Sequence, residues 1–259
     1  MRKKKEIFPN LYIVILLAIL YIPVLVLITL SFNVSEISSV WGGFTLDWYK
    51  VLFERTDVKE ALFTTIRVTG VATVVSITLA TLGAIGFYKF DFKGKTLVNS
   101  ILCLPSLVPP LVLGIALFGL YNVLGIKLSE GTITMAHITF CTPLAFSTIS
   151  STIDGFDRSI EEAARDLGCS QFQAITKVMI AVITPGILSA TLLCVTISLD
   201  DVLTSYFVAG TGKQTLSMLI YSLIKNGVKP DINALSTIMI VISVALGIFS
   251  QLLGRKRGR

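Results

Sequence analysis

Six long apolar runs constrain the fold of this 259-residue sequence more than any other feature. A helix needs roughly 20 apolar residues to cross about 30 Å of hydrocarbon. Each run reaches that length, and the expected spans cover residues 10–32, 61–87, 97–124, 132–153, 181–208 and 234–254. The sequence therefore predicts an all-α integral membrane protein with six transmembrane helices, residues 1–259 forming a single transmembrane domain.

Composition supports this class and excludes others. Hydrophobic residues make up 53% of the chain and charged residues 15%, whereas soluble domains average about 45–50% and about 25%. The net charge of +6 does not indicate nucleic-acid binding. Lys and Arg lie between and beyond the apolar runs, as in membrane proteins, instead of gathering on one face.

The distribution of Lys and Arg predicts the orientation. If the N-terminus is cytoplasmic, the inside segments are 1–9, 88–96, 154–180 and 255–259, and they hold 14 of the 22 Lys and Arg residues. The positive-inside rule then places both termini in the cytoplasm. The first run is longer than a signal peptide and no A-x-A site closes it, so we expect it to be an uncleaved span.

Prolines interrupt several spans, most densely between Pro105 and Pro110. Proline removes a backbone donor and kinks a helix, and such breaks are tolerated where protein or a cavity covers the freed carbonyls. We therefore expect a strong bend in the third span, which suits a protein that lines a pathway.

The loop 154–180 predicts two short helices. Ser159 with Glu162, and Ser170 with Gln173, form two capping boxes. Gly168 stands between them, where a left-handed cap is expected. From these residues alone, a projecting element and an amphipathic connector on the lipid surface are equally acceptable interpretations.

The spacing in this loop resembles a known signature. Glu162-Ala163-Ala164, three residues, Gly168, nine residues and then Val178-Met179-Ile180 is similar to the EAA motif of ABC importer permeases. Ala181 stands where that motif has proline, and Pro185 follows. The resemblance implies a type I permease whose loop is a coupling helix seated in a cleft of an ATPase subunit. The candidate ATPase-coupling residues are Glu161, Glu162, Ala163, Ala164, Asp166 and Gly168. Their small side chains allow close docking, and their carboxylates can meet a basic partner.

Further stretches resemble the spermidine/putrescine ABC importers, and within them the C-type membrane subunit. They are Phe44–Tyr49, Phe87–Lys95, His137–Pro143, Ser198–Val202 and Gly227–Thr237. The resemblance implies a polyamine permease of the bacterial inner membrane. It implies as partners a homologous permease subunit, an ATPase dimer and an extracytoplasmic polyamine-binding protein. ATP and Mg²⁺ are expected on the ATPase, with no cofactor on this chain.

Asp200 and Asp201 are adjacent carboxylates within an apolar run. A charge at the bilayer centre costs at least about 2.5–3.5 kcal/mol and usually faces a cavity or a partner. We expect the pair, with Tyr206 and Trp48, to line a cation pathway, since aromatic faces attract ammonium groups. A solvated helix end, an inter-subunit hydrogen bond and an interfacial aromatic belt stay open as alternatives. A single histidine, His137, is expected to be packed or hydrogen-bonded.

Catalytic and metal motifs are not apparent in the sequence. Gly94-Lys95-Thr96 lacks the first glycine of a P-loop, because Lys89 stands at that position. The four cysteines show no metal-ligand spacing, and we expect them to be small buried hydrophobes. We therefore predict a non-catalytic subunit without a metal site.

Three alternative functions compete with a polyamine permease. A sister importer could carry iron or an aminophosphonate, although an anionic substrate would sit poorly beside two aspartates. An ion-driven secondary carrier would need no ATPase, and the projecting loop argues against it. A membrane enzyme would need a nucleophile or metal site.

Overall fold

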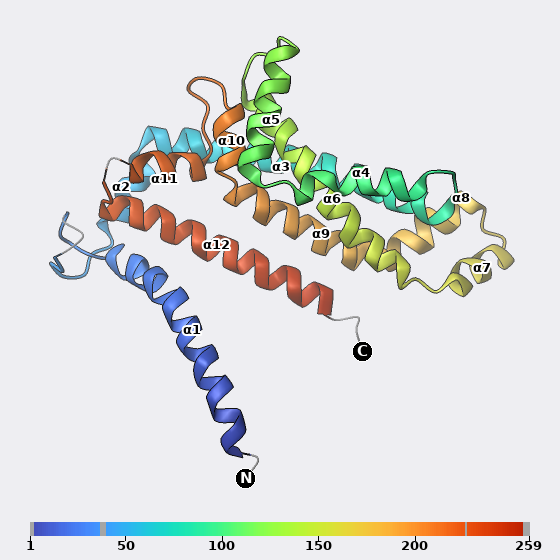
Figure 1. Ribbon diagram of the computed structural model, residues 1–259, viewed down its shortest axis with the longest axis horizontal. Coiled ribbons are helices and arrows are strands. Elements are labelled where there is room, and N and C mark those ends of the chain that lie inside the picture. Colours follow the sequence, from blue (N-terminus) through green and yellow to red (C-terminus); the bar gives the residue numbers. More distant parts are fainter. Residues whose placement is uncertain (1–2, 37–39, 226, 256–259) are drawn as a thin grey trace. The chain divides into compact units, whose positions relative to one another are not determined.

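The computed structural model describes residues 3–36, 40–225 and 227–255, and within these ranges the side chains of residues 12–250 and 252. Arg2 and the basic residues after Arg255, which contribute to the predicted orientation, lie outside the described residues. The described elements are all helical and run as follows: α1 Lys3–Leu30, α2 Asp47–Glu54, α3 Thr56–Lys89, α4 Lys95–Leu107, α5 Pro110–Val123, α6 Glu130–Asp154, α7 Arg158–Asp166, α8 Gln171–Gln173, the π-helix η1 Ala174–Met179, α9 Ile180–Asp200, α10 Leu203–Val208, α11 Leu216–Ile224 and α12 Pro230–Arg255 (Figure 1).

Five described helical segments are long and apolar enough to cross a membrane: Tyr12–Leu30, Thr56–Lys89, Glu130–Asp154, Gln171–Asp200 and Pro230–Ser250. The pair α4 and α5 passes the same test together, and it makes a sixth span if the two helices count as one. The all-α multi-span prediction is thus confirmed. The second span begins at Thr56, earlier than the predicted residue 61.

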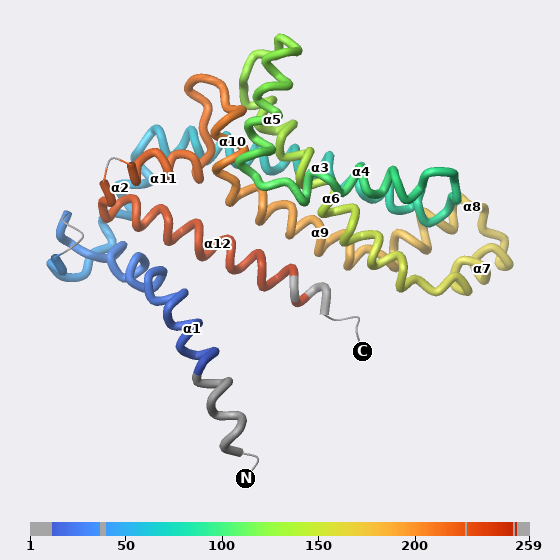
Figure 2. The backbone as a smooth tube through the Cα atoms, viewed as in Figure 1, coloured from blue at the N-terminus to red at the C-terminus, as the bar shows by residue number. Residues whose placement is uncertain are grey.

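The predicted bend in the third span is confirmed. The axes of α4 and α5 differ by 107°, and the tube in Figure 2 turns sharply between them. Val108 is extended, as a residue before proline tends to be. Pro110 then starts α5 at the first helical position, where its missing N–H costs nothing.

The fifth run differs from the prediction of one helix over 181–208. Helix α9 ends at Asp200, Asp201 is extended, and the short helix α10 follows. The Asp201 carboxylate accepts hydrogen bonds from the backbone N–H groups of Thr204 and Ser205. An aspartate side chain competes in this way with the helical ladder and caps the next helix instead.

Contacts divide the chain into two compact units, each described by itself: unit 1 is Met1–Lys59 with Ile220–Val241, and unit 2 is Glu60–Leu219 with Ile242–Arg259. The single domain expected over residues 1–259 stays a prediction. Unit 1 contains α2, an eight-residue helix in which Leu52 is buried. Its Arg55 guanidinium pairs with Asp57 and Asp231, each at 2.6 Å.

The core of unit 2 lies where α6 packs on α9. Gly186 permits the close approach, since a Cβ there would lie 2.7 Å from Cβ of Thr152. Cys141 and Cys194 face each other across this interface, each thiol directed to the other's carbonyl. These two cysteines are buried as predicted, whereas Cys103 and Cys169 are only half-buried.

Candidate functional site

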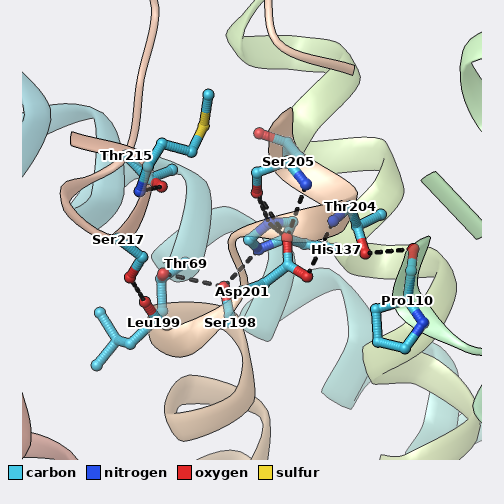
Figure 3. A network of polar contacts seen from close by, with 12 residues as sticks. Thr69, Pro110, His137, Ser198, Leu199, Asp201, Thr204, Ser205, Thr215 and Ser217 are labelled. Atoms are coloured by element: carbon cyan, nitrogen blue, oxygen red, sulfur yellow. Dashed lines mark hydrogen bonds and ion pairs between the residues drawn. The ribbon is translucent and has the colours of Figure 1, made fainter. Parts of the chain in front are cut away.

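A buried polar network lies at the break between α9 and α10, around the carboxylate of Asp201 (Figure 3). One carboxylate oxygen accepts from both the backbone N–H and the hydroxyl of Ser205, each at 2.8 Å. The side chain is only 8% exposed. A buried carboxylate needs such donors, because burying a charge without partners is costly.

His137 of α6 lies beside this carboxylate and is fully buried. Its Nδ1 lies 2.7 Å from the Ser198 hydroxyl, and its Nε2 lies 2.8 Å from the Ser205 hydroxyl. The prediction of a packed, hydrogen-bonded histidine is confirmed.

The hydroxyls of Ser198 and Ser205 join the histidine ring to further groups. Ser198 donates to the hydroxyl of Thr69 of α3, and Ser205 donates to the Asp201 carboxylate. Nε2 of His137 also lies 3.6 Å from that carboxylate. The network therefore links α3, α6, α9 and α10.

Asp200 lies in a different environment. It is the last residue of α9 and is exposed, and its carboxylate accepts a 2.8 Å hydrogen bond from the Ser243 hydroxyl of α12. The two adjacent carboxylates therefore differ in their partners. Asp201 is hydrogen-bonded within the chain, whereas Asp200 has a carboxylate oxygen available to an external group.

A cavity of about 160 Å³ connects the network to the proline bend. Its lining includes Pro105, Pro110, Phe140, Asp201 and Thr204. The volume is below the 300–1,000 Å³ of typical ligand pockets, so it suits a slender group and not a whole molecule. Helix α5 comes close to α10 beside it, because Gly114 has no Cβ to meet Thr204.

The two aromatic candidates lie in different units. Tyr206 of α10 is 52% exposed and stands edge-to-face against Phe207. Trp48 of unit 1 is half-buried, and its Nε1 donates a 2.7 Å hydrogen bond to the carbonyl of Asn33. Tyr206 therefore shares an element with the Asp201 network, and Trp48 is held by its own unit.

The loop after α6 forms the first predicted helix, α7, as a separate element, whereas the second predicted helix is the start of the continuous segment Gln171–Asp200. The cap of α7 also differs from the prediction. Helix α7 is capped by Asp157, which accepts a 2.9 Å hydrogen bond from the backbone N–H of Ser159. The predicted capping box of Ser159 with Glu162 is wrong. The Ser159 N–H, which the Glu162 side chain would have accepted from, donates to Asp157 instead. This hydrogen bond holds the pKa of Asp157 below its usual range.

The elbow between the two helices follows the prediction. Gly168 takes the left-handed conformation with φ +91°, and its N–H donates to the carbonyl of Arg165. Ser170 and Gln173 then form the expected capping box. The chain continues into the π-helix η1, which no sequence pattern indicated.

The candidate coupling residues divide into two groups. Glu162, Ala163, Asp166 and Gly168 are exposed, and Ala164 is half-buried. Glu161 instead forms an ion pair with Lys89 at the end of α3.

Two large apolar side chains on the same loop escaped the sequence reasoning. Leu167 is 88% exposed and Phe172 74%. Large apolar residues on either side of a glycine in an otherwise polar loop are the signal that could have identified them. Exposed apolar side chains in a polar loop are candidates for contact with another protein.

Within the described part of the chain, titratable side chains do not converge on a metal site. Among the residues that the structure describes, no group of three or more His, Cys, Asp or Glu could hold a metal ion.

Sequence relatives cover nearly the whole chain. The spermidine/putrescine transport system permease protein PotC of Haemophilus influenzae is 39% identical over 95% of this chain and 96% of its own. PotC of Escherichia coli K12 is 36% identical over 93% and 91%. The putrescine transport system permease protein PotI of the same strain is 36% identical over 85% and 81%.

Solved structures agree on the fold. A bacterial alginate ABC transporter, crystallised with an alginate-bound periplasmic protein, contains a chain that superposes with a TM-score of 0.73 at 17% identity. The match covers 98% of this chain and 96% of that one. A chain of the methionine ABC transporter MetNI gives 0.63 at 14% identity, over 83% and 100%. The membrane-subunit fold of ABC transporters is thus shared.

Residues 72–256, most of the chain, match the model of one protein family. The chain belongs to the family of binding-protein-dependent transport system inner membrane components.

Proposed function

We propose that this chain is a permease subunit of an ATP-binding-cassette importer that carries spermidine and putrescine into the cytoplasm. The observation that carries the proposal is the 36–39% identity to polyamine permeases over more than four fifths of the chain. The exposed carboxylate of Asp200 agrees with a cationic cargo.

The partners follow from the same proposal. A homologous permease subunit completes the membrane pathway, and an extracytoplasmic binding protein delivers the polyamine. Two ATPase subunits bind ATP and Mg²⁺, so this chain needs no cofactor and catalyses no reaction itself. Both termini face the cytoplasm in the bacterial inner membrane, as the distribution of Lys and Arg predicts.

Asp200 is the first intramembrane contact for an ammonium group in this account, because its carboxylate is exposed. Tyr206 offers an exposed aromatic face nearby along the chain, and Trp48 contributes from the outer loop. Asp201 lines the narrow cavity beside the proline bend, where the end of an alkylammonium chain fits by size.

Transport proceeds by alternating access. ATP closes the ATPase dimer and pushes the coupling segment 159–175 with it, which opens the cavity outward. The binding protein then releases its polyamine, and hydrolysis returns the cavity to the inside. The exposed carboxylates of Glu162 and Asp166 and the apolar Leu167 and Phe172 give the ATPase a surface to hold. A conformational change of this kind requires a partner that binds the two states differently.

Two other functions would predict different behaviour. An importer of iron or an aminophosphonate would still assemble with an ATPase but would not transport polyamines. An ion-driven carrier would need neither ATPase nor binding protein.

The test is purification of the tagged chain from cells that co-express the candidate partner genes, followed by reconstitution in vesicles. We expect an ATPase subunit to co-purify with the chain. Polyamine uptake into the vesicles should require ATP in the vesicle lumen. Uptake driven by an ion gradient without ATP, with no ATPase retained, would contradict the proposal.

A further inference from the structure

The end of α3 is tied to α7 by an ion pair that is largely shielded from water. The Lys89 ammonium contacts the Glu161 carboxylate, and the two side chains are only 13% and 12% exposed. The residues lie far apart in the sequence, so this contact joins a membrane span to the cytoplasmic loop directly.

An aromatic cluster surrounds the pair. The ring of Tyr88 lies 5.4 Å from the Lys89 ammonium and 5.3 Å from the Arg158 guanidinium of α7. The same ring stands edge-to-face against Phe156, which is buried in the turn before α7. Cation–π contacts of this kind hold a charged group against a ring and restrict its orientation.

The cluster continues into the helical core of unit 2. Phe87 packs edge-to-face on Phe146 of α6, with ring centroids 5.2 Å apart. Helix α7 is therefore attached to the end of α3 by the ion pair and the cation–π contact, and the end of α3 packs in turn on α6. A displacement of α7 cannot be absorbed by a loose loop, because these contacts must move with it or break.

A second Lys–Asp pair on the adjacent loop offers a contrast. Lys95 and Asp91 pair at 2.8 Å, but the aspartate is fully exposed. Exposed pairs contribute little because water screens them. Removing one partner of a shielded pair is different, since it leaves an uncompensated charge in a poorly solvated place.

We propose that Lys89 is a positioning residue for coupling: through Glu161 it fixes α7 to the end of α3, so that movement of the docked ATPase reaches the membrane span. The inference rests on the proposed function, in which α7 docks on the ATPase. It also assigns Glu161 a role within the chain, and leaves Glu162 and Asp166 for the partner.

The test is a charge exchange in the full reconstituted complex. Lys89→Glu and Glu161→Lys each place like charges together. We expect either change to lower polyamine uptake per ATP hydrolysed by about fivefold or more, the lower end of typical coupling between sites. Lys89→Glu/Glu161→Lys restores an ion pair, and Lys89→Arg keeps the positive charge. Both variants should therefore show most of the wild-type uptake per ATP hydrolysed.

A matched control uses the exposed pair. Lys95→Glu/Asp91→Lys and its single variants should leave uptake per ATP unchanged. Complex yield and the ATPase rate are measured for each variant, so that a folding defect is distinguished from lost coupling. If a charge reversal lowers the yield, Lys89→Gln replaces it, with Lys89→Arg as the reference.

The outcomes separate the two proposals. The role of Lys89 would be overturned if the single variants kept the wild-type uptake per ATP hydrolysed. It would also be overturned if uptake per ATP fell and neither the double exchange nor Lys89→Arg restored it. If the wild-type complex takes up no polyamine with ATP, the proposed function fails first.

Discussion

The Asp201 carboxylate lies 3.6 Å from Nε2 of His137, and both side chains are buried in unit 2. The pair joins α6 to the break between α9 and α10, and Ser198 extends it to Thr69 of α3. Three helical segments and a break thus meet at one polar centre. A cation that bound Asp201 would have to compete with the His137 ring that already lies beside this carboxylate.

Replacing His137 tests this dependence. His137→Ala removes one hydrogen-bond partner from Ser198 and one from Ser205, and a typical hydrogen bond contributes about 0.5–1.5 kcal/mol to stability. We expect a clear drop in the thermal unfolding midpoint of the purified complex. Thr139→Ala is the control, because that hydroxyl bonds only to its own helix at Met135. An equal effect of the two changes would contradict a central role for the histidine.

Gly168 is expected to be required for coupling. Its φ of +91° is accessible to glycine, whereas proline is fixed near −65°. Gly168→Pro should therefore displace α8 relative to α7 and uncouple uptake from ATP hydrolysis, measured together in vesicles. Gly94→Pro is the matched control, since Gly94 is also left-handed, at φ +87°, but lies outside this loop. Normal coupled uptake by Gly168→Pro would refute the docking role.

The cap of α7 should depend on pH. The folded state lowers the pKa of Asp157, so the cap stabilises α7 above the pKa of the unfolded carboxyl. That contribution is lost as the pH falls through the lowered pKa. Hydrogen exchange of the α7 amides, corrected for intrinsic rates, should show this loss in the wild type. Asp157→Asn keeps an acceptor without the titration, and Asp157→Ala should be unprotected at every pH. A wild-type profile equal to that of Asp157→Asn would contradict the assignment.

Much of the fold could be predicted from apolar run length, because the bilayer sets that length physically. The proline bend followed from chemistry that is local to Pro105–Pro110. The end of α9 could not be predicted, because an aspartate inside an apolar run does not indicate whether its carboxylate will cap a new helix. The pairing of Glu161 with Lys89 was equally inaccessible, because it depends on how two distant segments pack.

Alanine should affect the stability differently at two glycines, Gly186 at the interface of α6 and α9 and Gly119 in α5. Gly186→Ala places a methyl group against Thr152, and overpacking of this kind costs about 1–3 kcal/mol. Gly119→Ala meets nothing within 4 Å and gains helix propensity. Thermal unfolding of the two variants should move in opposite directions. A neutral Gly186→Ala would indicate that the helices separate easily.

The most direct test of the central claim is ATP-dependent uptake of labelled spermidine by the reconstituted complex, with putrescine and iron as competitors. The account predicts uptake that needs ATP, is competed by putrescine and not by iron, and falls in Asp200→Asn/Asp201→Asn at normal complex yield. Uptake in that variant equal to wild type would remove both aspartates from the pathway. ATP-dependent transport that ignores polyamines would contradict the substrate itself.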